Sequence, residues 1–180
     1  MEIKAFDFSG VFEITPPTFS DERGFFRVSF DKRLFSDHKL PVSFVQDNES
    51  FSHKGTLRGL HFQKAPHAQG KLVRVIRGRI QDIIVDLRPG SGTFGMWKSF
   101  YIDATLGNML YVPEGFAHGF LALEDTIFAY KCTDLYEKSA ESGIKWNDKD
   151  LGIEWDLDGM TPVISEKDEM LPIFVDFLAA

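Results

Sequence analysis

Short turn signals that separate short β-rich runs constrain the fold of this chain more than any other feature. They read TPP at 15–17, DERG at 21–24, HKG at 53–55, RPGSG at 88–92 and PEG at 113–115. Between them lie runs rich in β-branched and aromatic residues, including KLVRVIR, IQDIIVDL and TIFAYKCT. Such spacing leaves room for strands and little room for helices. The sequence therefore predicts an all-β sandwich or barrel.

Several of these runs alternate with the two-residue period of a half-buried strand. In the run at 80–87, the even-numbered residues would face one side and the odd-numbered residues the other. Further strands are predicted in VFEIT, FFRVSF, VSFVQ, KSFYI and MLYV. Two short helices are predicted, at 31–38 after an aspartate N-cap and at 165–170, where Ser165 and Asp168 have capping-box spacing. The part from Trp146 onward is predicted to wrap around the barrel.

One domain over residues 1–180 is predicted, because this length can bury one core and no linker divides it. The apolar runs are far shorter than the ~20 residues that cross a bilayer, and MEIKAFDF does not resemble a secretory signal. With Cys132 as the single cysteine, no internal disulfide can form, which fits the cytoplasm. A net charge of −7 argues against nonspecific nucleic-acid binding but allows a local positive site for a small anion.

The strand predicted at 57–63, LRGLHFQ, carries an unusual set of polar residues. Strict alternation would place Gly59 and His61 on one face and Arg58 on the other. If the face of His61 lines the barrel interior, that interior holds a cavity in which Gly59 leaves room for a ligand. The alternative is a core histidine that is hydrogen-bonded to backbone, the commoner role of a lone histidine.

Three further residues could act together with His61. Lys71 begins the next strand and shares a face with the valines of KLVRVIR, although a strand-end lysine that reaches water is the simpler interpretation. His118 stands in PEGFAHGF, at a predicted turn between strands and among aromatic residues. Tyr130 lies on one face of TIFAYKCT, where a packing tyrosine with a satisfied hydroxyl is the more frequent role.

Metal chemistry and phosphate-loop chemistry are not expected. His61 is followed at the second position by Gln63 rather than by another histidine. No aspartate or glutamate lies between His61 and Asp82. Three or four ligands at suitable spacing are therefore missing. Neither G-x-G-x-x-G nor G-x-x-x-x-G-K occurs in the chain. These patterns predict a metal-independent pocket that uses no cofactor.

Together these motifs resemble the dTDP-4-dehydrorhamnose 3,5-epimerase family along nearly the whole chain. The match is carried by DERGFF at 21–26, FVQDNES at 44–50, TLRGLHFQ at 56–63, QGKLVRVIRG at 69–78, VDLRPGSGTFG at 85–95, VPEGFAHGF at 112–120, YKCTDLY at 130–136 and ISEKD at 164–168. The resemblance implies a metal-free, cupin-type jelly-roll barrel with a few short helices. It also implies a homodimer in which the N-terminal strand of one subunit completes the site of its neighbour.

The resemblance implies a role for each motif residue. His61 would be the catalytic base and Asp168 its partner, while Lys71 would stabilise an oxyanion and Tyr130 would donate a proton. The residues implied to contact the substrate, including three aromatic residues that would pack on the nucleotide, are Phe19, Arg23, Phe26, Gln46, Asp47, Asn48, Arg58, His118, Tyr136, Glu141 and Lys167.

Two positions complicate this assignment. Arg58 suits a diphosphate, because guanidinium binds phosphate through paired hydrogen bonds, yet strict alternation turns it away from His61. Either Gly59 distorts the strand or Arg58 serves elsewhere. Val28 departs from the family's R-G-x-F-x-E pattern, in which the glutamate helps to hold the nucleotide.

The implied activity is inversion of C3 and C5 of dTDP-4-keto-6-deoxyglucose or a related nucleotide sugar, as in dTDP-rhamnose biosynthesis. Removing either proton next to the ketone gives an enolate, so a base, an acid and an oxyanion donor suffice. A single-centre epimerase acting on a related nucleotide sugar is one alternative, motivated by Val28. A noncatalytic cupin that binds a sugar nucleotide is the other.

Overall fold

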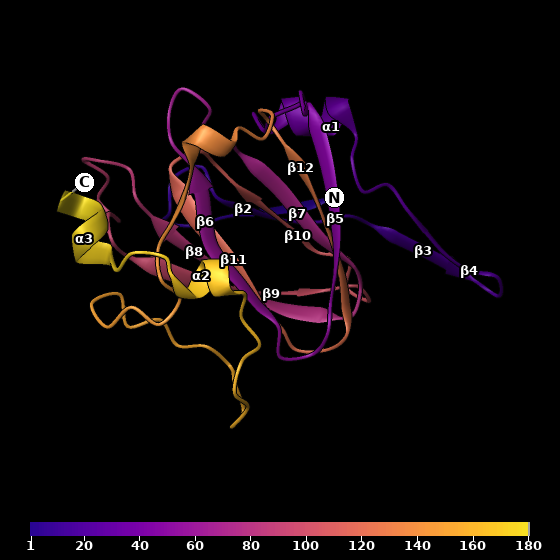
Figure 1. Ribbon diagram of the computed structural model, residues 1–180. Helices are drawn as coiled ribbons and strands as arrows, with labels where there is room; N and C mark the ends of the chain where they lie inside the picture. Colours follow the sequence, from indigo (N-terminus) through magenta and orange to yellow (C-terminus); the bar gives the residue numbers. More distant parts are fainter. Residues whose placement is uncertain (180) are drawn as a thin grey trace.

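The computed structural model describes residues 1–179, most of whose regular structure is β-strand, in two antiparallel sheets that form a barrel (Figure 1). The six-stranded sheet has the order β1 (Glu2–Ala5), β2 (Phe12–Thr15), β10 (Met109–Val112), β7 (Lys71–Arg77), β12 (Thr126–Cys132) and β5 (Gln46–Ser52). The five-stranded sheet has the order β13 (Glu141–Gly143), β6 (Leu57–Gln63), β11 (Phe116–Ala122), β8 (Arg79–Asp86) and β9 (Trp97–Asp103). The predicted all-β class is confirmed.

The barrel interior is filled by the inward faces of both sheets. Ile80 and Ile84 of β8 lie in the same buried cluster as Val73 of β7 and Phe128 of β12. The odd-numbered residues Ile83 and Val85 belong to a different cluster, on the outside of the five-stranded sheet. The two-residue alternation predicted for this strand is confirmed.

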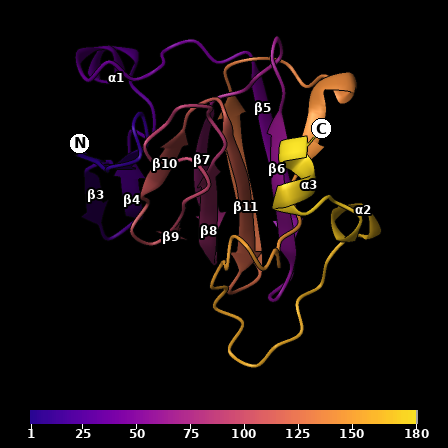
Figure 2. The same cartoon turned by 90° about the vertical axis from the view of Figure 1, so that its left-hand side faces the viewer.

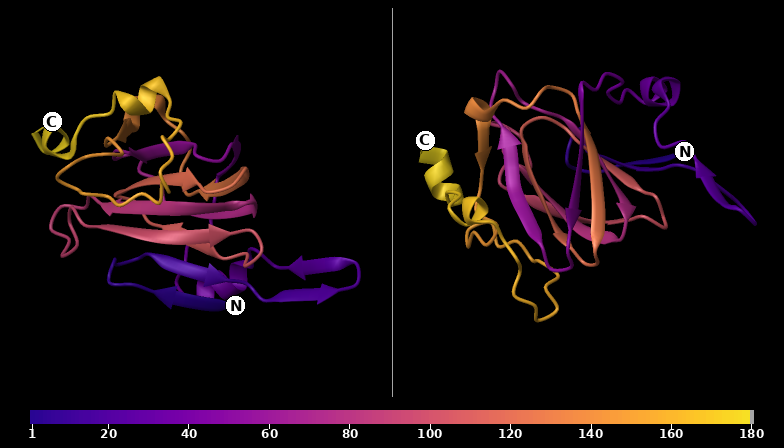
Figure 3. Two further views of the ribbon diagram at one scale, coloured as in Figure 1. Left: turned by 90° about the horizontal axis from the view of Figure 1, so that it is seen from below. Right: turned by 45° about the vertical axis from the view of Figure 1, so that its right-hand side comes forward.

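The two ends of the chain cover the outer faces of the two sheets, on opposite sides of the barrel (Figure 3). On the six-stranded sheet, Phe35 of α1 (Lys32–Asp37) packs with Leu72 and Met109. On the five-stranded sheet, the segment after β13 packs Leu151 and the short helix α3 (Phe174–Ala179) against β6 (Figure 2). The predicted C-terminal wrap is thus present, and it buries the outer side of the strand that carries His61.

Both predicted helices form with the predicted caps. Asp31 accepts hydrogen bonds from the first backbone N–H groups of α1. Ser165 caps α2 (Glu166–Glu169) by accepting from the backbone N–H of Asp168. The 3₁₀ helix η1 (Lys138–Ala140) and α3 were not predicted. Within residues 1–179, no helix has the length and apolar character to cross a membrane.

The strand predicted at VSFVQ is wrong for most of its length, because β5 begins only at Gln46. Val42 and Phe44 instead pack against the cluster under α1. Their apolar side chains pack on the outer face of the six-stranded sheet, and this segment does not form a strand. An apolar β-branched run is compatible with either role, so propensity alone could not distinguish them.

Strand β6 contains an irregularity at Gly59 that sets the geometry of the interior. His61 pairs with His118 and Arg58 pairs with Phe120, so three steps along β6 match two steps along β11. The additional residue is a β-bulge, which reverses the facing of the residues on one side of it. Gly59 has a φ of 113°, and a side chain there would lie 2.6 Å from the Cα atom of Gly119. Only glycine fits this position.

A hairpin of β3 (Thr18–Asp21) and β4 (Gly24–Arg27) projects away from the barrel as an arm (Figures 1 and 3). Its large aromatic side chains are mostly exposed, with 63% of Phe19 and 65% of Phe26 accessible to solvent. An exposed aromatic hairpin is unusual in a single chain, because such surface is normally buried against something.

Candidate active site

A cavity of about 390 Å³ lies between the two sheets and is closed on one side by α2. It is lined by residues of β5, β6, β7, β11 and β12 as well as α2, so both sheets contribute. Eight of the predicted site residues line it, namely Asn48, Arg58, His61, Lys71, His118, Tyr130, Lys167 and Asp168. Residues separated by up to 120 positions in the chain thus meet in one place.

His61 and Asp168 form a hydrogen-bonded pair, with Nε2 of the imidazole 2.7 Å from Oδ1 of the carboxylate. An ionised carboxylate can only accept, so Nε2 carries the hydrogen and Nδ1 of the neutral ring keeps its lone pair. Asp168 is buried, whereas a third of the His61 side chain is accessible. The free Nδ1 atom is therefore the one that can act as a base toward a bound substrate.

Two contacts hold α2 in the position from which Asp168 reaches His61. The Ser165 hydroxyl caps the helix, and the backbone N–H of Gly59 donates to Oδ2 of Asp168 at 3.1 Å. Burial alone would raise the pKa of the Asp168 carboxyl, but its hydrogen bonds with His61 and Gly59 hold the pKa below its usual value. The carboxylate stays ionised and can stabilise a protonated imidazole.

A second histidine–aspartate pair lies beside the first. His118 Nε2 is 2.8 Å from Oδ2 of Asp82, and both side chains are buried. The predicted turn location of His118 is wrong, because the residue lies in the middle of β11. Asp82 was not predicted as a site residue. Its signal is an acidic residue at an inward position of β8 between Ile80 and Ile84, which a packed core would not tolerate without a partner.

Lys71 and Tyr130 occupy the wall formed by β7 and β12. The Lys71 ammonium nitrogen lies 5.8 Å from the centre of the Tyr130 ring. Burial lowers the pKa of Lys71, and the nearby Cys132 and Asp82 oppose that shift only in part. Burial raises the pKa of Tyr130, which keeps its hydroxyl protonated. The cavity thus contains a base, an acid and a cation.

Arg58 lines the same cavity as His61, which resolves the two possibilities left by strict alternation. The bulge at Gly59 rotates Arg58 onto the cavity face. Its guanidinium donates to the hydroxyl of Ser52 and to the carbonyl of Phe51. The exposed side chain remains at the mouth, where it can meet an anion.

Four predicted residues form a connected group at the rim. The Lys167 ammonium contacts Oε1 of Glu141 at 2.6 Å, and the Tyr136 hydroxyl donates to Oε2 of the same carboxylate at 2.9 Å. The backbone N–H of Tyr136 donates to Gln46. The ion pair and hydrogen bonds hold these side chains together at the rim.

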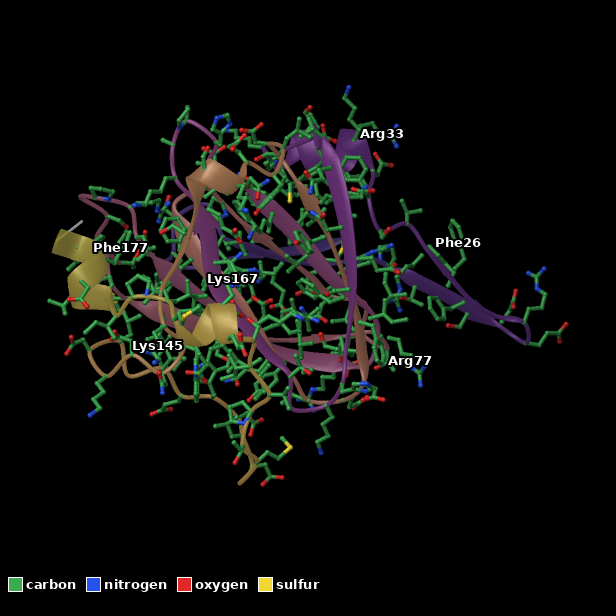
Figure 4. All side chains as sticks on the ribbon, in the orientation of Figure 1. Phe26, Arg33, Arg77, Lys145, Lys167 and Phe177 are labelled. Carbon is green, nitrogen blue, oxygen red and sulfur yellow. The ribbon has the colours of Figure 1, made fainter. Side chains whose placement is uncertain are left out.

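The remaining predicted residues lie elsewhere in the chain. Asp47 points to the outer side of β5, where it pairs with Lys131. Phe19, Arg23 and Phe26 are on the projecting arm, and Figure 4 shows Phe26 well separated from Lys167 on α2. The cavity of one chain is therefore not lined by the residues of its own arm.

The residues present offer proton-transfer groups rather than metal ligands. Within residues 1–179, no three histidine, cysteine or acidic side chains gather in a way that could hold a metal ion. The two histidines are each committed at Nε2 to a carboxylate. What the cavity can do is remove a proton at His61, supply one from Tyr130 and stabilise negative charge with Lys71.

Comparison with known proteins agrees with this geometry. The family model described as dTDP-4-dehydrorhamnose 3,5-epimerase matches residues 5–176. The dTDP-4-dehydrorhamnose 3,5-epimerase of Methanothermobacter thermautotrophicus is 51% identical over 88% of this chain and 86% of its own length. A dTDP-6-deoxy-D-glucose-3,5-epimerase of Legionella pneumophila, solved in complex with dTDP-4-keto-L-rhamnose, is 40% identical, covers 96% of this chain and 92% of its own, and has a TM-score of 0.91.

A more distant structure has a different specificity. The 3'-monoepimerase ChmJ of Streptomyces bikiniensis, in complex with dTDP-quinovose, is 33% identical with a TM-score of 0.88, over 94% of this chain and 87% of its own. Both solved structures share the fold of this chain, which confirms the predicted cupin-type jelly roll. Because the family model spans nearly the whole chain and the identity reaches 51%, this chain belongs to the dTDP-4-dehydrorhamnose 3,5-epimerase family.

Proposed function

We propose that this protein inverts C3 and C5 of a dTDP-4-keto-6-deoxyhexose by removing a proton next to the ketone at each carbon. The observation that carries the proposal is the pair of His61 and Asp168, joined at 2.7 Å in a cavity that also contains Lys71 and Tyr130. The relatives named above support the same substrate class. No cofactor is needed, since an enolate forms by proton transfer alone.

The stereochemistry of the sugar suits one base and one acid. In a gluco-configured chair, the hydrogens on C3 and C5 are axial on the same face, so His61 Nδ1 serves both carbons. Tyr130 returns a proton from the opposite face, which inverts the centre. Lys71 stabilises the negative charge on the C4 oxygen, a role worth ~3 kcal/mol for a single preorganised donor.

The cationic mouth of the cavity suits the diphosphate. Arg58 and Lys167 are both exposed and line the opening. Guanidinium binds phosphate through paired hydrogen bonds, and an ammonium adds a point charge. Lys167, whose side chain is 61% accessible, would have to exchange its contact with Glu141 for a phosphate oxygen. Glu141 would keep its hydrogen bond from the Tyr136 hydroxyl. The sugar and the nucleoside, on either side of the diphosphate, are assigned to Asn48, Gln46, Tyr136 and Glu141.

The arm supports a homodimer in which each chain completes the cavity of the other. Phe19, Arg23 and Phe26 are exposed on the arm, and none of them lines the cavity of its own chain. Placed over the mouth of a second copy, the two phenylalanines would stack on the base while Arg23 adds a charge for the diphosphate. The single free cysteine supports a cytoplasmic setting.

The test is isotope exchange in heavy water. Incubation with dTDP-4-keto-6-deoxyglucose is expected to place deuterium at both C3 and C5, detected by mass spectrometry and proton NMR of the released sugar. Absence of label at both carbons would refute the epimerase assignment and favour a noncatalytic sugar-nucleotide-binding protein.

A single-centre epimerase is the second candidate, favoured by two observations. Val28 replaces the family's glutamate, and a 3'-monoepimerase shares the fold at 33% identity. In the same experiment this candidate predicts deuterium at one carbon only, whatever the incubation time. If a different base is preferred, the uridine analogue of the substrate would be labelled faster than the thymidine compound.

A further inference from the structure

Inverting two carbons consumes two protons from the acid Tyr130, which carries only one. Each inversion removes one proton to His61 and consumes one proton from Tyr130. Tyr130 carries a single hydroxyl hydrogen, so after the first inversion it is a tyrosinate and cannot serve the second carbon. Its side chain is half-buried against the Phe128 ring and sits in a cavity that the substrate would fill. The second inversion therefore needs a proton source inside the site.

Asp82 has an unusual environment that bears on this requirement. One oxygen, Oδ2, is bound by His118 at 2.8 Å, while Oδ1 is buried and has no hydrogen-bond partner within residues 1–179. An unpartnered buried carboxylate oxygen costs several times what a typical hydrogen bond contributes. The cost falls when a proton resides on that oxygen or when a cation is close. Asp82 attracts Lys71, which lines the same cavity as His118 and Tyr130.

We propose that Lys71, Asp82 and His118 form a proton store that re-protonates Tyr130 between the two inversions, so that both carbons are inverted in one binding event. The inference rests on the proposed function and adds to it a role for Asp82. Asp82 does not need to touch the sugar, so it is a positioning residue that acts through Lys71 and His118.

The direction of transfer follows from the environments of donor and acceptor. Burial lowers the pKa of Lys71 and raises the pKa of Tyr130, and both shifts favour transfer of a proton from the ammonium to the tyrosinate. Burial also raises the pKa of Asp82, which makes this carboxylate a better proton acceptor than an exposed one. A coupled group of three titratable side chains can then share the gain or loss of one proton.

Each inversion takes one proton from carbon and returns one to it. In the first inversion a C–H bond breaks, His61 Nδ1 gains the proton, and the enolate carbon forms a new C–H bond with the hydrogen of Tyr130. One N–H bond of Lys71 then breaks as the O–H bond of Tyr130 re-forms. The O–H bond on Oδ1 of Asp82, the oxygen without a hydrogen-bond partner, breaks in turn and restores the ammonium form of Lys71. His61 loses its proton to solvent at the mouth, where its side chain is 33% accessible. The second inversion repeats the first, and the store regains its one missing proton from solvent after the product leaves.

The experiment follows single turnovers in heavy water with Asp82→Asn. An asparagine can still accept the hydrogen bond from His118 Nε2 but cannot hold a proton near neutral pH. We expect the fraction of released sugar labelled at one carbon only to rise at least tenfold, while the rate of the first inversion falls less than threefold. His118→Gln, which removes the other member of the pair, is expected to raise the same fraction.

The controls separate a proton store from a structural role. Asp148→Asn changes another buried carboxylate, one that binds backbone N–H groups outside the cavity, and should leave the singly labelled fraction unchanged. If Asp82→Asn slows both inversions equally and the singly labelled fraction stays at the wild-type value, the store is wrong. The same holds if Asp82→Asn does not fold and His118→Gln leaves the fraction unchanged. Absence of label at both carbons with the wild-type protein would instead refute the epimerase itself.

Discussion

His61 and His118 are direct cross-strand partners in β6 and β11, and each is bound through Nε2 to a different buried carboxylate. The two imidazoles therefore have the same tautomer and each keeps Nδ1 as an acceptor. Their surroundings differ, because His61 is one-third accessible and His118 is only 7% accessible. The accessible ring can exchange protons with substrate and solvent, whereas the buried ring can exchange them only with its neighbours.

Replacing His61 by alanine is expected to slow catalysis strongly while leaving binding intact. General-base catalysis contributes typically 10²–10⁴-fold, so deuterium incorporation at both carbons should fall by about that factor. Affinity for dTDP, measured by calorimetry, should change less than threefold, because Arg58 and Lys167 at the mouth are untouched. Unchanged exchange in His61→Ala would contradict the assignment and favour a binding protein.

Lys71 should set the alkaline limit of activity. Its ammonium form is the one that stabilises the enolate, and burial lowers the pKa of this ammonium below that of an ordinary lysine. Activity should therefore be lost as the pH rises through this lowered pKa, at a pH below that of an exposed lysine. The Tyr130 hydroxyl does not impose this limit, because its pKa is raised. In Lys71→Arg the alkaline limb of kcat against pH should move upward, and an unchanged limb would assign it to another group.

Much of the fold could be predicted from the sequence because its signals are local. The caps of α1 and α2 depend on Asp31 and Ser165, which lie next to the helices they begin. The inward and outward faces of β8 follow from a two-residue period within one strand. Each of these features is fixed by residues a few positions apart, so no knowledge of strand pairing was needed.

The features that could not be predicted depend on pairing between distant strands. The bulge at Gly59 exists because the backbone of β11 passes directly against it, with Gly119 in contact, and this bulge decides which way Arg58 faces. Asp82 acquires its role only when β8 pairs with β11 and brings His118 to it. No local pattern contains that information, since the partners are 36 residues apart.

Gly59→Ala should destabilise the protein and disrupt the site together. The added Cβ atom would lie 2.6 Å from Gly119 Cα and 2.8 Å from the carbonyl oxygen of His118, at a φ of 113° that side chains rarely adopt. Backbone strain and overpacking together should cost on the order of 3 kcal/mol or more in the free energy of unfolding. Gly90→Ala is the matched control, with positive φ but no neighbour within 4 Å, and should cost about 1 kcal/mol. If urea unfolding shows that Gly59→Ala and Gly90→Ala lose the same free energy of unfolding, the close approach of Gly119 does not matter for stability.

Asp86 should make stability depend on acid pH. Burial would raise its pKa, but hydrogen bonds from Arg88, Ser91 and Thr93 hold the pKa well below its usual range. A depressed pKa in the folded state gives stability that is present above the unfolded pKa of about 3.9 and is lost as the pH falls. Asp86→Asn should cost about 3 kcal/mol at pH 7, with the difference from wild type shrinking below pH ~4.

The control for this prediction is an aspartate without such partners. Asp37 is exposed at the end of α1, so Asp37→Asn should change the free energy of unfolding by less than ~0.5 kcal/mol at either pH. The prediction is wrong if the free energies of unfolding of Asp86→Asn and wild type do not converge as the pH falls. In that case the ionised Asp86 carboxylate and Arg88 do not stabilise the fold.

Exchange of arms between two chains can be tested with two variants that impair different parts of the site. Arg23→Ala should raise KM for the nucleotide sugar without changing the melting temperature, because the arginine is 84% accessible and its hydrogen bonds within residues 1–179 go to its neighbour Asp21. When Arg23→Ala and His61→Ala chains are unfolded together and refolded, half of the dimers should be mixed. In a mixed dimer with exchanged arms, the chain that keeps His61 receives an intact Arg23 from its partner. That site is complete, so about a quarter of all sites should recover wild-type kcat/KM. If each arm instead serves its own chain, every site lacks one of the two residues, and mixing yields no more activity than the two variants give separately.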